Sequence, residues 1–142
     1  MRFLGLDIGD RKIGIAVSDE LGWIAQGVET YFRRNIEEDI KYLSQVISRY
    51  KPEKIVIGLP INMNGTLGPQ AEKVKEFSSK LQEKLQQQII FWDERLTTVA
   101  AEKTLIQADM SRKKRKKKVD MLAAIFILQS YLDANSKRNG VF

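Results

Sequence analysis

Hydrophobic and polar positions along the chain predict an α/β fold that opens with three strands. Residues 2–8, 12–18 and 23–32 are rich in apolar and β-branched side chains, the pattern expected of strands. Between the first two lie Gly9, Asp10 and Arg11, which predict a tight turn. The opening of the chain is therefore expected to form an antiparallel meander.

The rest of the chain alternates between helical and strand patterns. Two segments carry apolar residues at helical spacing, and a short apolar run follows each of them: helix 36–50 with strand 53–60, and helix 70–87 with strand 88–92. A helix is expected to begin near Thr97 or Thr98, whose hydroxyls can cap it, and a last helix covers about 117–133. Right-handed crossovers make the first, fourth and fifth strands parallel. The order predicts a five-stranded mixed sheet with helices on both faces, as in the RNase H-like fold.

Length and composition narrow the classes of protein. A chain of 142 residues suits one domain, which we place at 1–135 with a short tail at 136–142. No apolar run approaches the roughly 20 residues that span a bilayer, and the N-terminus does not read as a signal peptide, so we expect a cytoplasmic protein without a membrane partner. The chain has neither cysteine nor histidine. Any hydrolytic chemistry then depends on carboxylates, Lys, Tyr or hydroxyls, with a hard metal such as Mg²⁺ or Mn²⁺ as the natural cofactor.

Acidic residues stand at the ends of two strands that are expected to be parallel. Asp7 closes the first strand, and Asp93 and Glu94 close the fifth. Because such ends share one edge of the sheet, these carboxylates are expected to meet in space. Adjacent strand residues point to opposite faces, so Asp93 and Glu94 cannot both face the site unless the strand has already ended; we favour Glu94. Asp19 is expected roughly 17 Å from Asp7, at the other end of the hairpin.

A fourth carboxylate lies on the last helix. Asp120, Ala124, Ile127 and Tyr131 fall on one helical face, flanked by Ala123 and Leu128, and this apolar face should pack on the sheet. A buried carboxylate needs a cation, and several that converge need a divalent one. Purely structural roles stay open: Asp120 can stabilise the helix start, Asp7 can support the turn, and Asp93 and Glu94 can be ordinary polar residues after a strand.

One segment holds nearly all the excess positive charge of the chain. Its seven cations exceed the net charge of +6, so the remainder carries −1. Such a block suits a polyanion, and we expect a mobile loop that binds phosphates; a solubilising loop is the alternative. The segment consists of Arg112, Lys113, Lys114, Arg115, Lys116, Lys117 and Lys118. Further nucleic-acid contacts are expected from Arg11, Lys12, Asn62 and Arg95, and from backbone N–H groups of the loop after the fourth strand, which can equally be a plain connector.

Four stretches resemble one family and cover nearly the whole chain in the family's order. They read LGLDIGDRKIGIAVSD (4–19), IVIGLPINMNGTLGPQAEKVKEF (55–77), FWDERLTTVAAEKTL (91–105) and KKVDMLAAIFILQSYLD (117–133). The chain resembles the YqgF/RuvX family, described as pre-16S rRNA nucleases and Holliday junction resolvase-like proteins. One departure is Asn64, which stands where the family's loop usually carries Asp.

The resemblance implies a metal-dependent endonuclease whose acids map onto Asp7, the Asp93–Glu94 pair and Asp120. The residues permit the same chemistry, with Mg²⁺ or Mn²⁺ held by Asp7, Glu94 and Asp120. We favour 5′-end processing of pre-16S rRNA, with a ribosome precursor as partner. Cleavage of branched DNA, and non-catalytic nucleic-acid binding, remain alternatives. The sequence leaves a monomer and a homodimer open. The segment DIGDRKIG also resembles the first phosphate loop of actin-like ATPases. Such an ATPase needs two domains of this kind, and the chain has room for only one.

Overall fold

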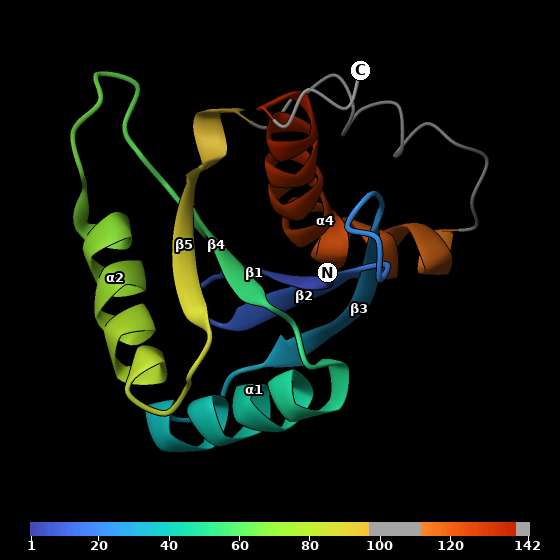
Figure 1. The fold of residues 1–142 in the computed structure, drawn as a ribbon. Coiled ribbons are helices and arrows are strands. Elements are labelled where there is room, and N and C mark those ends of the chain that lie inside the picture. The colour runs from blue at the N-terminus through green and yellow to red at the C-terminus, as the bar shows by residue number, and fades with distance from the viewer. Residues whose placement is uncertain (97–111, 139–142) are drawn as a thin grey trace.

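Five strands form one mixed sheet in the order β3-β2-β1-β4-β5 (Figure 1). The computed structural model describes residues 1–96 and 112–138, with side chains in the last helix described from 121 to 135. Strand β1 is antiparallel to β2 and parallel to β4, which is parallel to β5. The elements are β1 (Phe3–Ile8), β2 (Lys12–Ser18), β3 (Ala25–Phe32), α1 (Ile36–Tyr50), β4 (Lys54–Leu59), α2 (Pro69–Gln82), β5 (Gln88–Asp93), the 3-10 helix η1 (Glu94–Leu96) and α4 (Arg112–Arg138).

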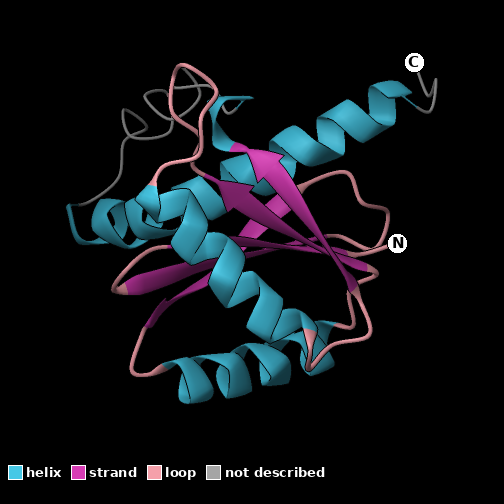
Figure 2. Cartoon of the chain, turned by 90° about the vertical axis from the view of Figure 1, so that its left-hand side faces the viewer, coloured by secondary structure: helices cyan, strands magenta, loops and turns pink. Residues whose placement is uncertain are grey.

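Helices cover both faces of the sheet, as the sequence predicts (Figure 2). On one face, alternate strand residues such as Leu4, Leu6 and Ile57 pack with α1 and α2 in the larger apolar core. On the other, Phe3, Val56 and the inner side of α4 form a second core. Because side chains alternate along a strand, Asp7 continues the row of Phe3 and Gly5 and therefore faces α4.

Two element boundaries differ from the prediction because side chains of the connecting segments take over the backbone hydrogen bonds. Strand β3 begins at Ala25 rather than residue 23, since the Asp19 carboxylate accepts hydrogen bonds from the N–H groups of Trp23 and Ile24. Helix α2 ends at Gln82 rather than 87. There the Gln82 amide donates to the Gln87 carbonyl and accepts from the Ile89 N–H, and so turns the chain into β5.

The prediction of a mobile loop at residues 112–118 is wrong, because these residues begin helix α4, which extends to Arg138. The prediction weighed the mutual repulsion of the cations and neglected that Lys and Arg favour helices. The apolar inner face of α4 is confirmed: Ala124, Ile127 and Tyr131 are buried, although Ala123 is exposed. The helix expected near Thr97 or Thr98 lies outside the described residues.

Candidate active site

Two carboxylates, Asp7 and Glu94, approach each other on the α4 face at the ends of β1 and β5. Of the Asp93–Glu94 pair, Glu94 turns this way, directly after strand β5 ends at Asp93. Trp92 faces α4, where its indole N–H donates to the Ser130 hydroxyl at 3.0 Å. Glu94 lies two residues further on, and its carboxylate comes so close to Gly58 that a Cβ atom there would be 2.8 Å from the Glu94 Oε1. The sequence reasoning preferred Glu94 without this reason.

Gly58 makes room for that carboxylate. It occupies the α4 side of β4, opposite Trp92 in the sheet register, and a Cβ on it would also lie 2.3 Å from the Ile127 Cδ1. Sequence reasoning did not select this residue. A glycine inside a buried strand is nonetheless a signal that another group approaches the backbone closely.

The electrostatics of the pair indicate carboxylates placed where they are costly to ionise. Burial raises the pKa of Asp7 above its ordinary value. Burial, followed by the negative charges of Asp7 and Asp93, raises the pKa of Glu94 to about 7. A bound divalent cation would relieve both burial and repulsion, and carboxylate oxygens are the ligands that Mg²⁺ and Mn²⁺ prefer. The donor set therefore fits such a metal, although no cluster of three acidic side chains occurs among the residues described.

The expected third acid, Asp120, belongs to helix α4 one turn before Ala124. Its side chain lies outside the described residues. The carbonyl oxygen of Ala124 would lie 3.2 Å from a Cβ on Gly5, two residues before Asp7 in β1. The backbone of α4 thus passes close to β1 one turn after Asp120.

Asp93 faces away from Glu94 and holds Arg95. The Arg95 guanidinium donates to both oxygens of the Asp93 carboxylate, with an Nη2–Oδ2 distance of 2.7 Å, and its Nη1 reaches the carbonyl of Asn62 at 3.4 Å. The hydrogen bond from Arg95 lowers the pKa of Asp93. The structure therefore brings Asp93, Arg95 and Asn62 together, and the Asp93 carboxylate anchors the Arg95 guanidinium.

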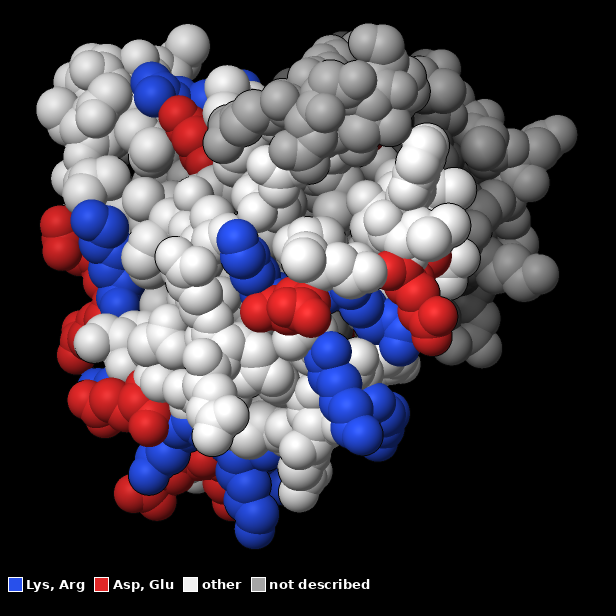
Figure 3. All heavy atoms as spheres, viewed as in Figure 1, with Lys and Arg blue, Asp and Glu red and all other residues white. Residues whose placement is uncertain are grey.

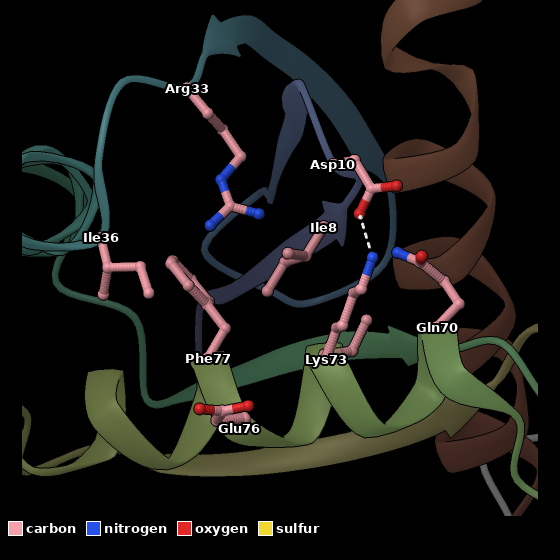
Figure 4. A pocket seen from close by; sticks show the side chains of 9 residues that line it. Ile8, Asp10, Arg33, Ile36, Gln70, Lys73, Glu76 and Phe77 are labelled. Carbon is pink, nitrogen blue, oxygen red and sulfur yellow. Dashed lines mark ion pairs between the residues drawn. The ribbon is translucent and has the colours of Figure 1, made fainter.

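The turn that follows Asp7 is held by Arg33, another residue that sequence reasoning missed. Its Nη1 donates to the Gly9 carbonyl, its Nε donates to the Asp39 carboxylate, and its guanidinium lies over the Phe77 ring, 4.8 Å from the centroid. Figure 4 shows Arg33 in a pocket of about 200 Å³, where Lys73 pairs with Asp10 at 3.6 Å. Arg33 thus ties the β1–β2 turn to both helices of that face.

The remaining predicted nucleic-acid contacts are scattered. Arg11 is exposed in the β1–β2 turn, while Lys12 lies over the Phe32 ring. The side chains of 112–118 lie outside the described residues. On the face seen in Figure 3, acidic and basic side chains are interspersed, without a large area of one sign. Asp19 lies at the opposite sheet edge, as expected, where it caps the β2–β3 turn.

A mixed five-stranded sheet with paired carboxylates at the ends of its inner and outer parallel strands places the chain in the RNase H-like class. Solved structures share this fold: RuvC of T. thermophilus in complex with a Holliday junction substrate matches with a TM-score of 0.68 at 14% identity, covering 99% of this chain and 96% of that one. The Fowlpox virus resolvase with Holliday junction DNA matches at a TM-score of 0.61 and 13% identity, covering 95% and 99%.

The chain belongs to the RuvX family. The family's sequence model, described as Holliday junction resolvase, matches residues 1–134. A Clostridium tetani protein named "Putative pre-16S rRNA nuclease" is 62% identical over 94% of this chain and 97% of its own length. A protein of the same name from Desulforamulus reducens is 58% identical over 96% of this chain and its whole length.

Proposed function

We propose that the chain is a metal-dependent endonuclease that trims the 5′ end of pre-16S rRNA. The observation that carries this proposal is a pair of desolvated carboxylates: Glu94 lies against Gly58, and the negative charge of Asp7 helps to raise its pKa. The names of the curated relatives support the rRNA substrate, and the family description favours a junction-cleaving alternative.

In this proposal Asp7 and Glu94, with Asp120 from α4, hold Mg²⁺ or Mn²⁺. Held by these carboxylates, such a metal would supply an activated water and charge stabilisation for the departing oxygen of the phosphodiester. Asp93 keeps the Arg95 guanidinium beside the site, where it can neutralise negative charge on the phosphate. Arg33 holds the turn after β1 and so fixes the position of Asp7.

The substrate binds through its phosphates to the cations of Arg112–Lys118 at the start of α4, with Arg11, Lys12 and Asn62 as further contacts. Of the described helices, none is long and apolar enough to cross a bilayer. We propose a cytoplasmic enzyme that meets a ribosome precursor. A junction resolvase that cuts two strands symmetrically would act as a two-fold dimer, whereas a trimming enzyme can act as a monomer.

Cleavage assays test the catalytic proposal. Wild type with Mn²⁺ is expected to cut a 5′-extended 16S rRNA fragment in preference to a four-way DNA junction. Asp7→Asn should lower the rate roughly 1,000-fold, since one metal ligand contributes several kcal/mol. The control is Glu20→Gln, an exposed acid at the opposite sheet edge. Equal cleavage by wild type and Asp7→Asn would overturn the catalytic role; preference for the junction, together with a dimer in sedimentation, would favour the resolvase.

Salt dependence of binding tests the basic segment. Changing Lys113, Lys114, Arg115, Lys116 and Lys117 to Gln should weaken RNA binding and reduce the slope of log K against log salt by roughly 3 to 4 units if all five meet phosphates. The control removes four exposed cations, Lys41 of α1, Lys75 and Lys80 of α2, and Lys84 just after α2. An unchanged slope in the first variant would remove the segment from the interface.

A further inference from the structure

The loop between β4 and α2 is a small closed hairpin that rises above the catalytic edge of the sheet (Figure 1). Ile61 and Leu67 form an antiparallel bridge at its base. Inside it, the Asn62 N–H donates to the Thr66 carbonyl at 3.0 Å, and the Gly65 N–H donates to the Asn62 carbonyl at 2.8 Å. The loop therefore satisfies its own backbone, instead of presenting all these N–H groups to phosphates as the sequence suggested.

Side chains lock the hairpin further. The Asn62 amide donates to the Thr66 hydroxyl at 3.1 Å, and the Asn64 carboxamide oxygen accepts from both the hydroxyl and the N–H of Thr66, at 2.6 and 3.1 Å. Gly65 has a φ of +86°, which a residue with a side chain adopts only with strain. A loop built in this way holds its tip in one conformation before any partner arrives.

The tip carries Met63, whose side chain is 98% exposed, more than any other large hydrophobic residue in the described part of the chain. The hairpin fold makes no use of this side chain, since the bonds that close the loop run through its polar neighbours Asn62, Asn64 and Thr66. A single exposed apolar side chain does not by itself mark an interface. What singles out Met63 is the closed, hydrogen-bonded hairpin that carries it.

The hairpin that carries Met63 begins beside the segment that the Glu94 carboxylate contacts. Ile61, at the base of the hairpin, is three residues after Gly58, next to which the Glu94 carboxylate lies. The Arg95 guanidinium, next to Glu94, bonds the carbonyl of Asn62 immediately before Met63. No charged residue occurs from Ile61 to Gly68, so the hairpin does not repel a polyanion.

We propose that Met63 contacts an unstacked base of the nucleic acid next to the cleaved phosphate, acting as an apolar wedge. This rests on the proposed nuclease function, because it supposes a nucleic acid seated at Asp7 and Glu94. Proteins open base steps by inserting apolar side chains, and the thioether of methionine is soft enough to lie against any base.

Binding of a fluorescent substrate tests the wedge. The probe is an RNA hairpin with a 5′ single-stranded extension and 2-aminopurine at the junction of single and double strand; a four-way DNA junction with 2-aminopurine at the branch is the second probe. Asp7→Asn serves as the parent, so that neither is cut. Fluorescence should rise on binding as the base unstacks, and Met63→Ala in this background should abolish most of the rise and weaken binding about fivefold.

Two matched variants separate the wedge from a general loss of apolar surface. Met63→Leu should retain the signal, and Leu21→Ala, which removes a 76% exposed apolar side chain at the opposite sheet edge, should leave it unchanged. As a second readout, bound RNA should protect Met63 from peroxide oxidation, whereas Met1, which is 63% exposed, should oxidise as before.

The outcomes distinguish the wedge from the nuclease. An equal fluorescence rise in Met63→Ala and its parent overturns the wedge, even if wild type cleaves. A rise that depends on Met63, combined with absence of cleavage by wild type, keeps the wedge and overturns the nuclease. A chain that binds neither probe contradicts the wedge as well.

Discussion

Asp39 and the Asp7–Glu94 pair are carboxylates enclosed by the same sheet and its helices, and they differ in what surrounds them. Asp39, 1% exposed, accepts hydrogen bonds from the Tyr31 hydroxyl, the Arg33 Nε and the Arg34 N–H, all at 2.9 Å. Burial acts to raise the pKa of Asp39, but these hydrogen bonds bring it below its ordinary value. The pKa values of Asp7 and Glu94 are instead both raised, by burial and, for Glu94, also by the negative charges of Asp7 and Asp93.

The difference teaches how a structural acid is told from a candidate functional one. A buried charge with a full set of donors stabilises the folded state by joining β3, α1 and the turn after β1. A pair of half-buried carboxylates whose negative charges repel each other destabilises the folded state until a cation or a proton arrives. Removing a structural acid of the first kind should therefore lower the stability of the protein, whereas removing an acid of the second kind should lower its function.

The largest effect on stability is expected from Asp39→Ala. It leaves the Arg33 guanidinium, the Tyr31 hydroxyl and the Arg34 N–H without their acceptor, which should lower the free energy of unfolding by about 3 kcal/mol. Urea denaturation measures this. Glu37→Ala, an exposed acid in the same first turn of α1, should cost less than about 0.5 kcal/mol. Similar losses in the two variants would mean that Asp39 contributes no more than a surface acid.

Gly58→Ala should have an intermediate effect on stability, and it should also weaken metal binding at the Asp7–Glu94 pair. The new Cβ would meet the Ile127 Cδ1 at 2.3 Å and the Glu94 Oε1 at 2.8 Å, so we expect a loss of about 2 kcal/mol in unfolding free energy and weaker Mn²⁺ binding. Ile127→Val, which removes the Cδ1, should restore part of the stability of the Gly58→Ala variant but leave its Mn²⁺ affinity low. Calorimetric titration with Mn²⁺ measures that affinity, and its full recovery in the double variant would contradict a direct contact of Gly58 with the metal site.

Much of this arrangement could be predicted from the sequence, and the exceptions have physical causes. The antiparallel opening and the parallel first, fourth and fifth strands follow from alternating patterns and right-handed crossovers, and the structure confirms them. Glu94, just after the fifth strand, lies near enough to Asp7 that, besides burial, the Asp7 charge raises its pKa. The choice of Glu94 over Asp93 could not be made from the sequence, because it depends on where strand β5 ends and on the space that Gly58 leaves for the Glu94 carboxylate. The helical start of α4 was not predicted, because the repulsion among the cations favoured a loop. The high helix propensity of Lys and Arg outweighs that repulsion.

The partners of Asp39 illustrate the same limit. They are close to Asp39 in sequence: Tyr31, Arg33 and Arg34. Their spacing does not distinguish an acid that accepts hydrogen bonds between β3 and α1 from an acid on a helix surface. Asp39 sits in the first turn of α1 beside Glu37 and Glu38, and all three read alike as residues favoured by the helix dipole. Only the packing of β3 against α1 buries one of them.

The smallest effect, and the most selective, is the dependence of stability on pH. The pKa of Glu94 is about 7 in the folded state and near 4.5 when unfolded, so between these values the folded state binds a proton that the unfolded state does not. Stability should therefore fall as pH rises from about 4.5 to 7 and level off above, by roughly 1 kcal/mol once solvent screening is allowed for. Asp7, whose pKa is also raised, acts in the same direction.

Glu94→Gln should flatten this dependence and make the chain more stable than wild type at pH 8, because the repulsion with Asp7 disappears. The chain contains no histidine, so no other side chain ordinarily titrates near pH 7, and thermal unfolding from pH 5 to 8 reports on the pair with little interference. Saturating Mn²⁺ should reverse the wild-type trend, since a metal needs the deprotonated carboxylates, and should leave Glu94→Gln nearly unaffected. An unchanged slope in Glu94→Gln would mean that Glu94 is as well solvated as a surface acid, and the contrast with Asp39 would then rest on Asp7 alone.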